Sequence, residues 1–211
     1  MNNTNKRLVV ITCLIFLMSS PLISFFSLPF FSKSDPVQIR TWGQINFGKE
    51  DSNIQIVVFE DLNCPYCKKY FLEEFPKIKE AYIDTEIASY TDITLTFLKS
   101  RDIAAAAHYV YEVDKEKYFP FLHEYFSTSA FQHGTKANIK ITAENIGMKD
   151  FNPGKGVEMK DVLFFDNNLE IARKSMPGTN VTVPKIFVNG ERLKDATFKA
   201  VKKAVEKNLN K

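Results

Sequence analysis

The stretch from Val57 to Phe71, VVFEDLNCPYCKKYF, constrains this chain more than any other part of the sequence. This stretch overlaps a continuous apolar run with β-branched residues, Ile54 to Phe59. Such a run is typical of a central strand buried on both faces. The run leads to two cysteines three positions apart. Pro65 between them suits the first turn of a helix. The sequence therefore predicts a buried strand that delivers Cys64 and Cys67 to a helix N-terminus.

This placement makes the two cysteines unequal. The helix macrodipole and the unpaired N–H groups of the first turn favour the thiolate form of a cysteine at that position, so Cys64 is the candidate nucleophile. Cys67 lies one turn later on the same side and can attack a mixed disulfide formed on Cys64. We therefore expect Cys67 to be the resolving cysteine and the pKa of Cys64 to lie below its ordinary value.

A structural disulfide and a zinc site are alternative uses of such a pair. A disulfide that closes so short a loop removes little entropy from the unfolded chain and stabilises weakly. A zinc site needs two further ligands, and the three histidines, His108, His123 and His133, show no paired spacing. We expect no metal and no organic cofactor, with His108 and His123 as packing or surface residues of helices.

The first 34 residues predict export to the periplasm or another extracytoplasmic space. Lys6 and Arg7 precede an uncharged apolar stretch, Leu8 to Phe31, which is long enough to span a bilayer. The basic flank predicts that the N-terminus stays in the cytoplasm. Cleavage-site residues are poorly placed, so a cleaved signal peptide and an uncleaved membrane anchor both stay open. Cys13 is interpreted as an apolar residue of this segment rather than a lipid-modified one.

The charge pattern indicates no nucleic-acid partner. The chain has 28 Lys and Arg against 25 Asp and Glu, and two of the basic residues precede the apolar stretch. The C-terminal lysines alternate with apolar residues at helical spacing, which is typical of a solvated helix face. Neither feature resembles the basic patch of a nucleic-acid-binding domain.

Residues 35–211 predict one α/β domain. A first strand is expected at Gln38 to Phe47, and another at Ile93 to Leu98. The patterns between them indicate a helix with a buried stripe and a kink at Pro76. From about 101 to 175 the patterns are helical, which predicts an inserted helical block with a mostly buried aromatic cluster: Tyr118, Phe119, Phe121, Tyr125 and Phe126. A strand at Lys185 to Val188, a hairpin turn at Asn189-Gly190 and a last amphipathic helix follow.

Together these features resemble the DsbA-like thiol-disulfide oxidoreductases of the thioredoxin superfamily. The resemblance rests on four segments: FEDLNCPYC, the alanine-rich helix after Arg101, FPFLHEYF and VPKIFVNG. It implies a thioredoxin fold with an inserted helical domain, preceded by an N-terminal signal or anchor segment. In this family the proline of the last motif is cis and faces the two cysteines, which implies that role for Pro184. The open backbone beside Val183 would then pair with an extended substrate segment.

Two positions depart from the family pattern. The buried carboxylate that thioredoxins and DsbA carry six residues before the first cysteine is replaced by Val58, so Glu60 and Asp61 are the remaining candidates to assist Cys67. The dipeptide Pro65-Tyr66, which supports the active site, resembles that of glutaredoxins and DsbG, whereas Val183 resembles DsbA.

The resemblance implies an exported enzyme that exchanges disulfides with cysteine-containing envelope or secreted proteins. A membrane redox partner would recycle the Cys64–Cys67 pair. A stabilised Cys64 thiolate favours the oxidase direction, because it stabilises the reduced form of the enzyme. Three alternatives stay open: a reductase or isomerase of the same fold, a redox-inactive chaperone or peptide-binding module that uses the aromatic cluster, and a cytosolic glutaredoxin-like enzyme, which the N-terminal segment disfavours.

Overall fold

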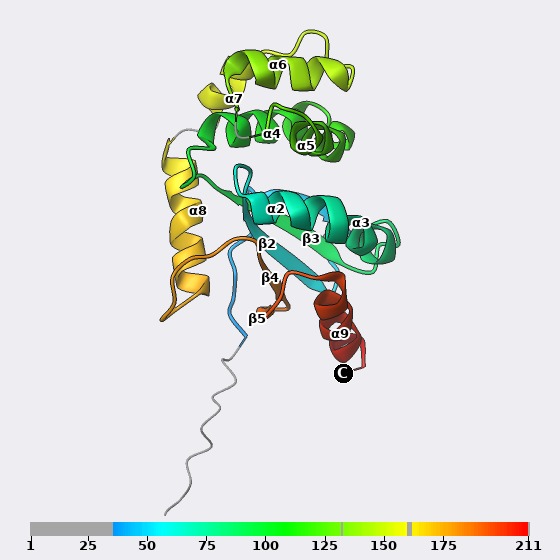
Figure 1. Cartoon of the computed structure of the whole chain (residues 1–211). Coiled ribbons are helices and arrows are strands. Elements are labelled where there is room, and N and C mark those ends of the chain that lie inside the picture. The colour runs from blue at the N-terminus through cyan, green and yellow to red at the C-terminus, as the bar shows by residue number, and fades with distance from the viewer. Residues whose placement is uncertain (1–35, 132, 160–161, 211) are drawn as a thin grey trace, which may run out of the picture. The chain divides into compact units, whose positions relative to one another are not determined.

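The computed structural model describes residues 36–131, 133–159 and 162–210 (Figure 1). The predicted signal or anchor segment, residues 1–34, lies outside the described residues, and so does Cys13. In the part of the chain that is described, no helix has both the length and the apolar character needed to cross a membrane.

A five-stranded mixed sheet, in the order β1-β3-β2-β4-β5, carries the functional residues. Its central strand β2 runs parallel to β3, and the other neighbouring pairs are antiparallel. The strands are β1 (Ile45–Gly48), β2 (Gln55–Asp61), β3 (Ser89–Leu95), β4 (Lys185–Val188) and β5 (Glu191–Arg192). The residues of β2 after Gln55 are all buried, which confirms the prediction of a central strand covered on both faces.

The first strand is shorter than predicted. Of the expected range Gln38 to Phe47, only Ile45 to Phe47 belongs to β1. Trp42 lies in a turn with Gly43, whose φ of +77° is a conformation that suits glycine, and the Trp42 side chain is exposed. The prediction that the strand includes Trp42 was therefore wrong.

The predicted strand Ile93 to Leu98 was wrong at both ends. Strand β3 begins at Ser89 and pairs with β2 from there, although its first four residues, SYTD, lack an apolar alternation. It ends at Leu95, and Phe97 and Leu98 are exposed in the following loop. Pairing with β2, rather than local pattern, sets the limits of this strand.

A continuous helical run from Pro65 to Ile83 follows β2. It comprises α2 (Pro65–Lys69), the π-type segment η1 (Tyr70–Glu74), α3 (Phe75–Ile78) and the π-type segment η2 (Lys79–Ile83). The Phe75 N–H donates to the carbonyl of Tyr70, five residues back. This wider turn directly precedes Pro76, whose ring has no N–H and needs room beside the preceding turn. The predicted apolar stripe is buried: Phe71, Phe75, Ile78 and Tyr82.

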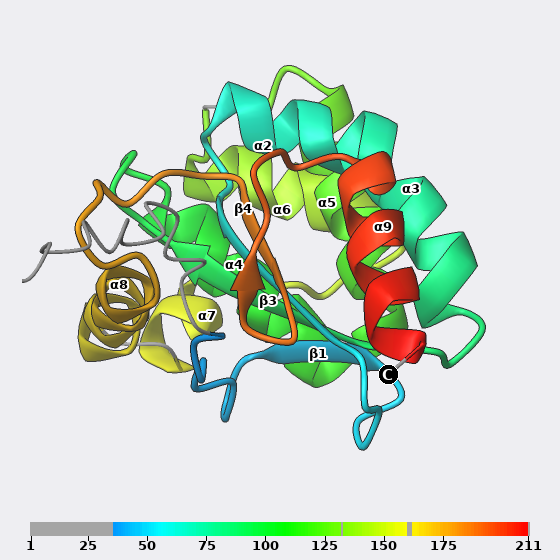
Figure 2. The same cartoon turned by 90° about the horizontal axis from the view of Figure 1, so that it is seen from below.

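Helices cover both faces of the sheet. The α2–α3 run and α9 (Phe198–Leu209) pack on the face that carries Ile56 and Val58. Helix α8 (Val162–Ser175) packs on the other face, where Ile171 and Ala172 meet Val57. Figure 2 shows α8 and α9 on opposite sides of the central strands.

The region between β3 and β4 is helical, as predicted. Its elements are α4 (Arg101–Val113), the 3₁₀ turn η3 (Lys115–Lys117), α5 (Tyr118–Ser127), α6 (Lys136–Asn145), α7 (Pro153–Met159) and α8. Helices α4 to α7 form a block above α2 and the sheet, whereas α8 runs beside the sheet (Figure 1). Four members of the aromatic cluster are buried in this block, and Phe119 packs against them. This confirms that the cluster is mostly core.

The β4–β5 hairpin turns at Asn189 and Gly190, which have φ of +47° and +75°. This confirms the predicted turn. Glycine is required at the second position, because a Cβ there would lie 2.3 Å from the carbonyl oxygen of Val37. The Val37 N–H donates to the Gly190 carbonyl at 3.0 Å, so the turn also holds the segment that enters the domain.

Candidate active site

The loop between β2 and α2 presents Cys64 as the N-cap of the helix, with Pro65 in its first turn. Asp61 holds this loop. Its carboxylate accepts the N–H of Asn63 and the N–H of Leu98, each at 2.9 Å, and its carbonyl accepts the N–H of Cys64 at 2.9 Å. These bonds occupy both carboxylate oxygens of Asp61. The Asp61 side chain, one of the two candidates to assist Cys67, therefore stabilises the loop.

The two sulfurs differ in access. The Cys64 residue is 5% exposed and Cys67 is fully buried. The Sγ of Cys67 accepts the N–H of Asp61 at 3.5 Å, which places it against the end of β2. Tyr66 between them is 73% exposed. An incoming sulfur can therefore reach Cys64 only.

The Val183–Pro184 peptide bond is cis. The Sγ of Cys64 lies 3.7 Å from the carbonyl oxygen of Val183, to which the thiol can donate. Both parts of the expectation for this segment are confirmed: the bond is cis, and it lies against the redox pair.

The surroundings separate the pKa values of the two thiols. The pKa of Cys64 is lowered to about 6, chiefly because Cys67 donates a hydrogen bond to its sulfur, with further help from the backbone N–H groups of Cys67 and Tyr66. This confirms the expected lowering. Burial raises the pKa of Cys67 far above its ordinary value, and the hydrogen bond to Cys64 and the charge of Glu60 raise it further. Cys64 is thus the thiolate of the pair, and Cys67 holds its proton.

A buried pair of carboxyl groups lies on the Cys67 side of the sheet. Glu60 on β2 and Asp92 on β3 are 1% and 2% exposed. Burial raises the pKa of Glu60 well above its ordinary value, and the neighbouring Asp92 raises it further. Burial also raises the pKa of Asp92, but hydrogen bonds from Glu60 and from the Tyr118 hydroxyl, at 2.5 Å, oppose that shift.

Each of the two groups therefore holds a proton more tightly than a carboxyl group in water does. One oxygen of each group, Oε1 of Glu60 and Oδ1 of Asp92, has no other hydrogen-bond partner among the described residues. A proton shared by the two groups supplies the missing bond and leaves a single negative charge, because two adjacent buried carboxylates cannot both ionise easily.

The sequence matches a family model described as Thioredoxin over residues 40–207. The chain belongs to the thioredoxin family. A probable disulfide bond formation protein D of Bacillus cereus is 29% identical over 178 residues, which cover 80% of this chain and 80% of that protein. The chain is therefore a DsbA-like thiol-disulfide oxidoreductase, as its motifs predict.

Two solved structures of this kind share the fold. The crystal structure of oxidised BdbD from Bacillus subtilis matches with a TM-score of 0.70 and 24% identity, covering 83% of this chain and 98% of that one. Chlamydia trachomatis DsbA matches with a TM-score of 0.69 and 22% identity, covering 84% and 97%.

The structure brings together every residue that the motifs singled out for this thioredoxin-family site: Cys64, Pro65, Cys67, Val183 and Pro184, with Tyr66 and Pro184 lining one groove beside them. Sequence reasoning missed Asp92 and Tyr118. His108 is buried against the rings of Phe164 and Phe165, and His123 is exposed on α5, as expected for packing and surface residues. Nowhere among the described residues do three His, Cys, Asp or Glu side chains gather as metal ligands.

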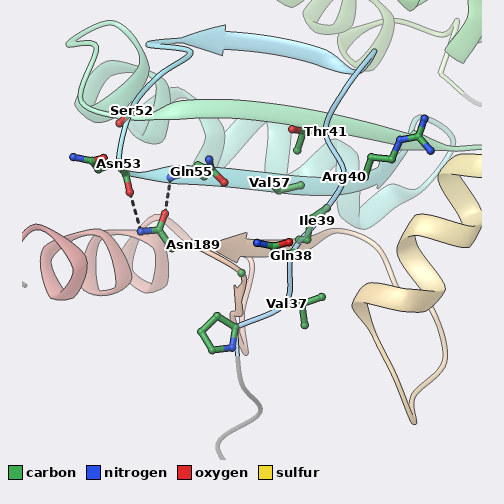
Figure 3. Close-up of a pocket in the computed structure, with 12 residues that line it drawn as sticks. Val37, Gln38, Ile39, Arg40, Thr41, Ser52, Asn53, Gln55, Val57 and Asn189 are labelled. Carbon is green, nitrogen blue, oxygen red and sulfur yellow. Dashed lines mark hydrogen bonds between the residues drawn. The ribbon is translucent and has the colours of Figure 1, made fainter.

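A pocket of about 660 Å³ lies away from the cysteines, between the segment 36–41 and β2 (Figure 3). Asn189 spans one end of it. Its Oδ1 accepts the N–H of Gln55 at 2.7 Å, and its Nδ2 donates to the carbonyl of Asn53 at 2.9 Å. These contacts join the hairpin to the start of β2, and neither Cys64 nor Cys67 lines this pocket.

Proposed function

We propose that this thioredoxin-family chain is an exported oxidase that transfers disulfides to cysteine-containing envelope or secreted proteins through Cys64 and Cys67. One observation carries the proposal: at the N-terminus of α2, the more accessible sulfur has a lowered pKa and the buried sulfur a raised one. Such a pair has a nucleophile that leaves readily and a partner that is protonated when it is released.

The reaction begins with the Cys64–Cys67 disulfide. A substrate thiolate attacks Sγ of Cys64, the bond to Cys67 breaks, and Cys67 takes up a proton. A second thiolate of the substrate then attacks the substrate sulfur of the mixed disulfide, and Cys64 leaves as a thiolate. Two electrons have passed from the substrate dithiol to the cysteine pair. The low pKa of Cys64 speeds the second step, because a thiol of lower pKa is a better leaving group.

The Glu60–Asp92 pair is the proposed source and acceptor of the Cys67 proton. When Cys67 attacks a mixed disulfide, its thiol proton passes to the pair, which goes from one proton to two. The same proton returns when the disulfide opens and Cys67 leaves. The net charge of the buried region is then unchanged in each transfer, which avoids a second uncompensated charge away from water.

Export and recycling complete the proposal. The basic Lys6 and Arg7 before the apolar stretch Leu8 to Phe31 support export, with the segment either cleaved or kept as an anchor. The similarity to a probable disulfide bond formation protein of Bacillus cereus supports the oxidase direction. A membrane redox partner that withdraws the two electrons would return the pair to its disulfide.

Single cysteine variants test the proposal. Reduced Cys67→Ala protein is mixed with a disulfide-bonded protein substrate, and we expect it to accumulate a mixed disulfide through Cys64. Cys64→Ala protein should form none and should exchange no disulfides. Equal trapping by both variants would refute the assignment of roles. Oxidation of a reduced substrate by wild-type protein then tests direction: a reductase leaves that substrate reduced, and a redox-inactive chaperone keeps its activity after loss of both cysteines.

A further inference from the structure

A groove with an excess of positive charge runs from the redox pair to the β4–β5 hairpin. It consists of two adjoining pockets of about 520 and 500 Å³, which share Thr182, Lys185 and Lys194. The first pocket contains Val183 and Pro184, beside Cys64, and the second contains Arg192. We call this surface, defined by Thr182, Lys185, Arg192 and Lys194, the basic groove.

Lys185 and Lys194 face each other across the hairpin. Phe187 pairs with Arg192, and the Leu193 N–H donates to the Ile186 carbonyl at 2.9 Å, so the next opposed pair outward is Lys185 and Lys194. Like charges directly opposite each other in an antiparallel pair are unfavourable. A bound anion would relieve this repulsion.

No carboxylate among the described residues forms an ion pair with Lys185, Arg192 or Lys194. Most nearby acids are paired with other cations: Glu73 pairs with Lys69 at 3.9 Å, Glu74 pairs with Lys77 at 3.7 Å, and Glu191 pairs with Lys207. Among the described residues that line the groove, only Asp195, which is exposed, adds a negative charge that has no ion-pair partner. The groove therefore keeps a net positive charge.

Hydrogen-bond donors accompany the charge. The guanidinium of Arg192 donates to Oγ1 of Thr179 at 3.2 Å, and both side chains line the groove with Asn180. Charged donors of this kind form short, strong hydrogen bonds with carboxylates. The groove thus offers an acidic side chain both charge and donors.

The position of the groove relates it to the substrate. The Val183 carbonyl is 3.7 Å from the Cys64 sulfur, and Lys185 follows two residues later. A polypeptide whose cysteine is joined to Cys64, and which lies along Val183, has its neighbouring residues over Lys185 and Lys194. We propose that the basic groove selects protein substrates that carry Asp or Glu within about three positions of the reactive cysteine. This inference rests on the proposed thiol exchange.

Three dithiol peptides of equal length test it, with Asp and Glu, Asn and Gln, or Lys flanking the reactive cysteine. The oxidation rate by full-chain disulfide-form protein is measured at about 20 mM and about 300 mM salt, because screening weakens exposed charge pairs. We expect the acidic peptide to react about threefold to tenfold faster than the neutral one at low salt, and the preference to fall below about twofold at high salt.

The double variant Lys185→Gln/Lys194→Gln should lose this preference while it oxidises the neutral peptide at the wild-type rate. Lys49→Gln is the matched control, because Lys49 follows β1, at the opposite edge of the sheet from β5. It should keep the full preference. Equal rates for acidic and neutral peptides in the wild type, or a preference that survives in the double variant, would overturn the inference while the proposed function stands. If no peptide is oxidised, the proposed function fails and this inference fails with it.

Discussion

Asp92 of β3 lies directly across from Val58 of β2 in the parallel pairing of the two strands. Val58 occupies the position at which related enzymes carry a buried carboxylate, so in this chain the neighbouring strand supplies that group. Glu60, two residues further along β2, shares the proton of Asp92. The carboxylate beside the resolving cysteine is therefore present as a pair drawn from two strands.

Glu60→Gln tests the role of this pair. Because burial raises the Glu60 pKa, its contribution to stability is fully present below the unfolded pKa of about 4.3 and is lost as pH rises through the folded value. Glutamine does not titrate but keeps a donor for Asp92. We expect the variant to gain up to about 2 kcal/mol in free energy of unfolding at pH 7 relative to wild type, and the gain to disappear near pH 4.

The same substitution should slow attack by Cys67. Glutamine can neither take up the Cys67 proton nor pass a proton on to Asp92, and loss of a positioned proton acceptor reduces a rate by about 100-fold or more, so resolution of a trapped mixed disulfide should slow to that degree. Stopped-flow measurement of resolution between pH 5 and pH 9 checks this. Glu73→Gln is the control, since Glu73 is an exposed acid paired with Lys69. A wild-type resolution rate and pH profile in Glu60→Gln would contradict the proposed proton transfer.

Tyr118→Phe removes the hydroxyl that donates to Asp92 at 2.5 Å. The buried carboxyl pair, which carries a negative charge, then loses a hydrogen-bond donor, and we expect the free energy of unfolding to fall by about 1.5–3 kcal/mol. Tyr66→Phe, which alters an exposed hydroxyl, should change it by less than about 0.5 kcal/mol. Denaturant titration of both variants measures the difference, and equal stability would show that the bond to Asp92 contributes little.

Local sequence predicted the reactive half of this site well. The strand, the turn and the helix that present Cys64 and Cys67 are adjacent in the chain, and each has its own pattern: an apolar β-branched run, a proline in the first helical turn and an apolar helical stripe. The Asn189-Gly190 turn is equally local. The cis proline segment is distant in sequence, and only its likeness to a family motif connected Pro184 with the cysteines.

The supporting half of the site could not be found in this way. Asp92 lies in a polar stretch, SYTD, whose strand character comes from pairing with β2. Its approach to Glu60 depends on the register between two strands separated by the whole α2–α3 run, and its hydrogen bond to Tyr118 depends on how α5 packs. The one signal of a strand available here was a period of two residues. In it, Tyr90, Asp92 and Thr94 alternate with Thr91, Ile93 and Leu95.

The contact between α7 and α4 makes a separate prediction about the helical block. A Cβ on Gly156 would lie 2.5 Å from the carbonyl oxygen of Ala105, whereas a Cβ on Gly154 would meet only the side-chain oxygen of Asn152, at 3.2 Å. Gly156→Ala should therefore force the helices apart and lower the free energy of unfolding by about 1–3 kcal/mol. Gly154→Ala should have a much smaller effect. Thermal unfolding of the two variants compares them, and equal losses would contradict the close packing.

The last prediction concerns the thiolate and the direction of electron transfer. Because the pKa of Cys64 is about 6, alkylation of the reduced protein should rise with pH through about 6 and level off above about 7. Cys67→Ala removes the donor that contributes most to this lowering, so the midpoint should move up toward the ordinary value of about 8.5. Thiolate absorbance measured against pH gives both midpoints, and unchanged titration of Cys67→Ala would show that the backbone N–H groups alone hold the thiolate.

The lowered pKa of Cys64 also predicts the direction in which the stability of the reduced protein and its redox potential change. A depressed thiol pKa stabilises the reduced folded protein above the unfolded pKa of about 8.5, and this stabilisation is lost as pH falls toward about 6. Stabilising the reduced form makes the couple more oxidising, while Tyr66 offers no positive charge to the thiolate. We expect a potential between about −270 mV, as in thioredoxin, and about −120 mV, as in DsbA, from equilibration with glutathione at pH 7. A value at or below −270 mV would assign the protein to the reductases, because the Cys64–Cys67 dithiol would then hold its electrons less tightly than the substrate and would pass them to substrate disulfides.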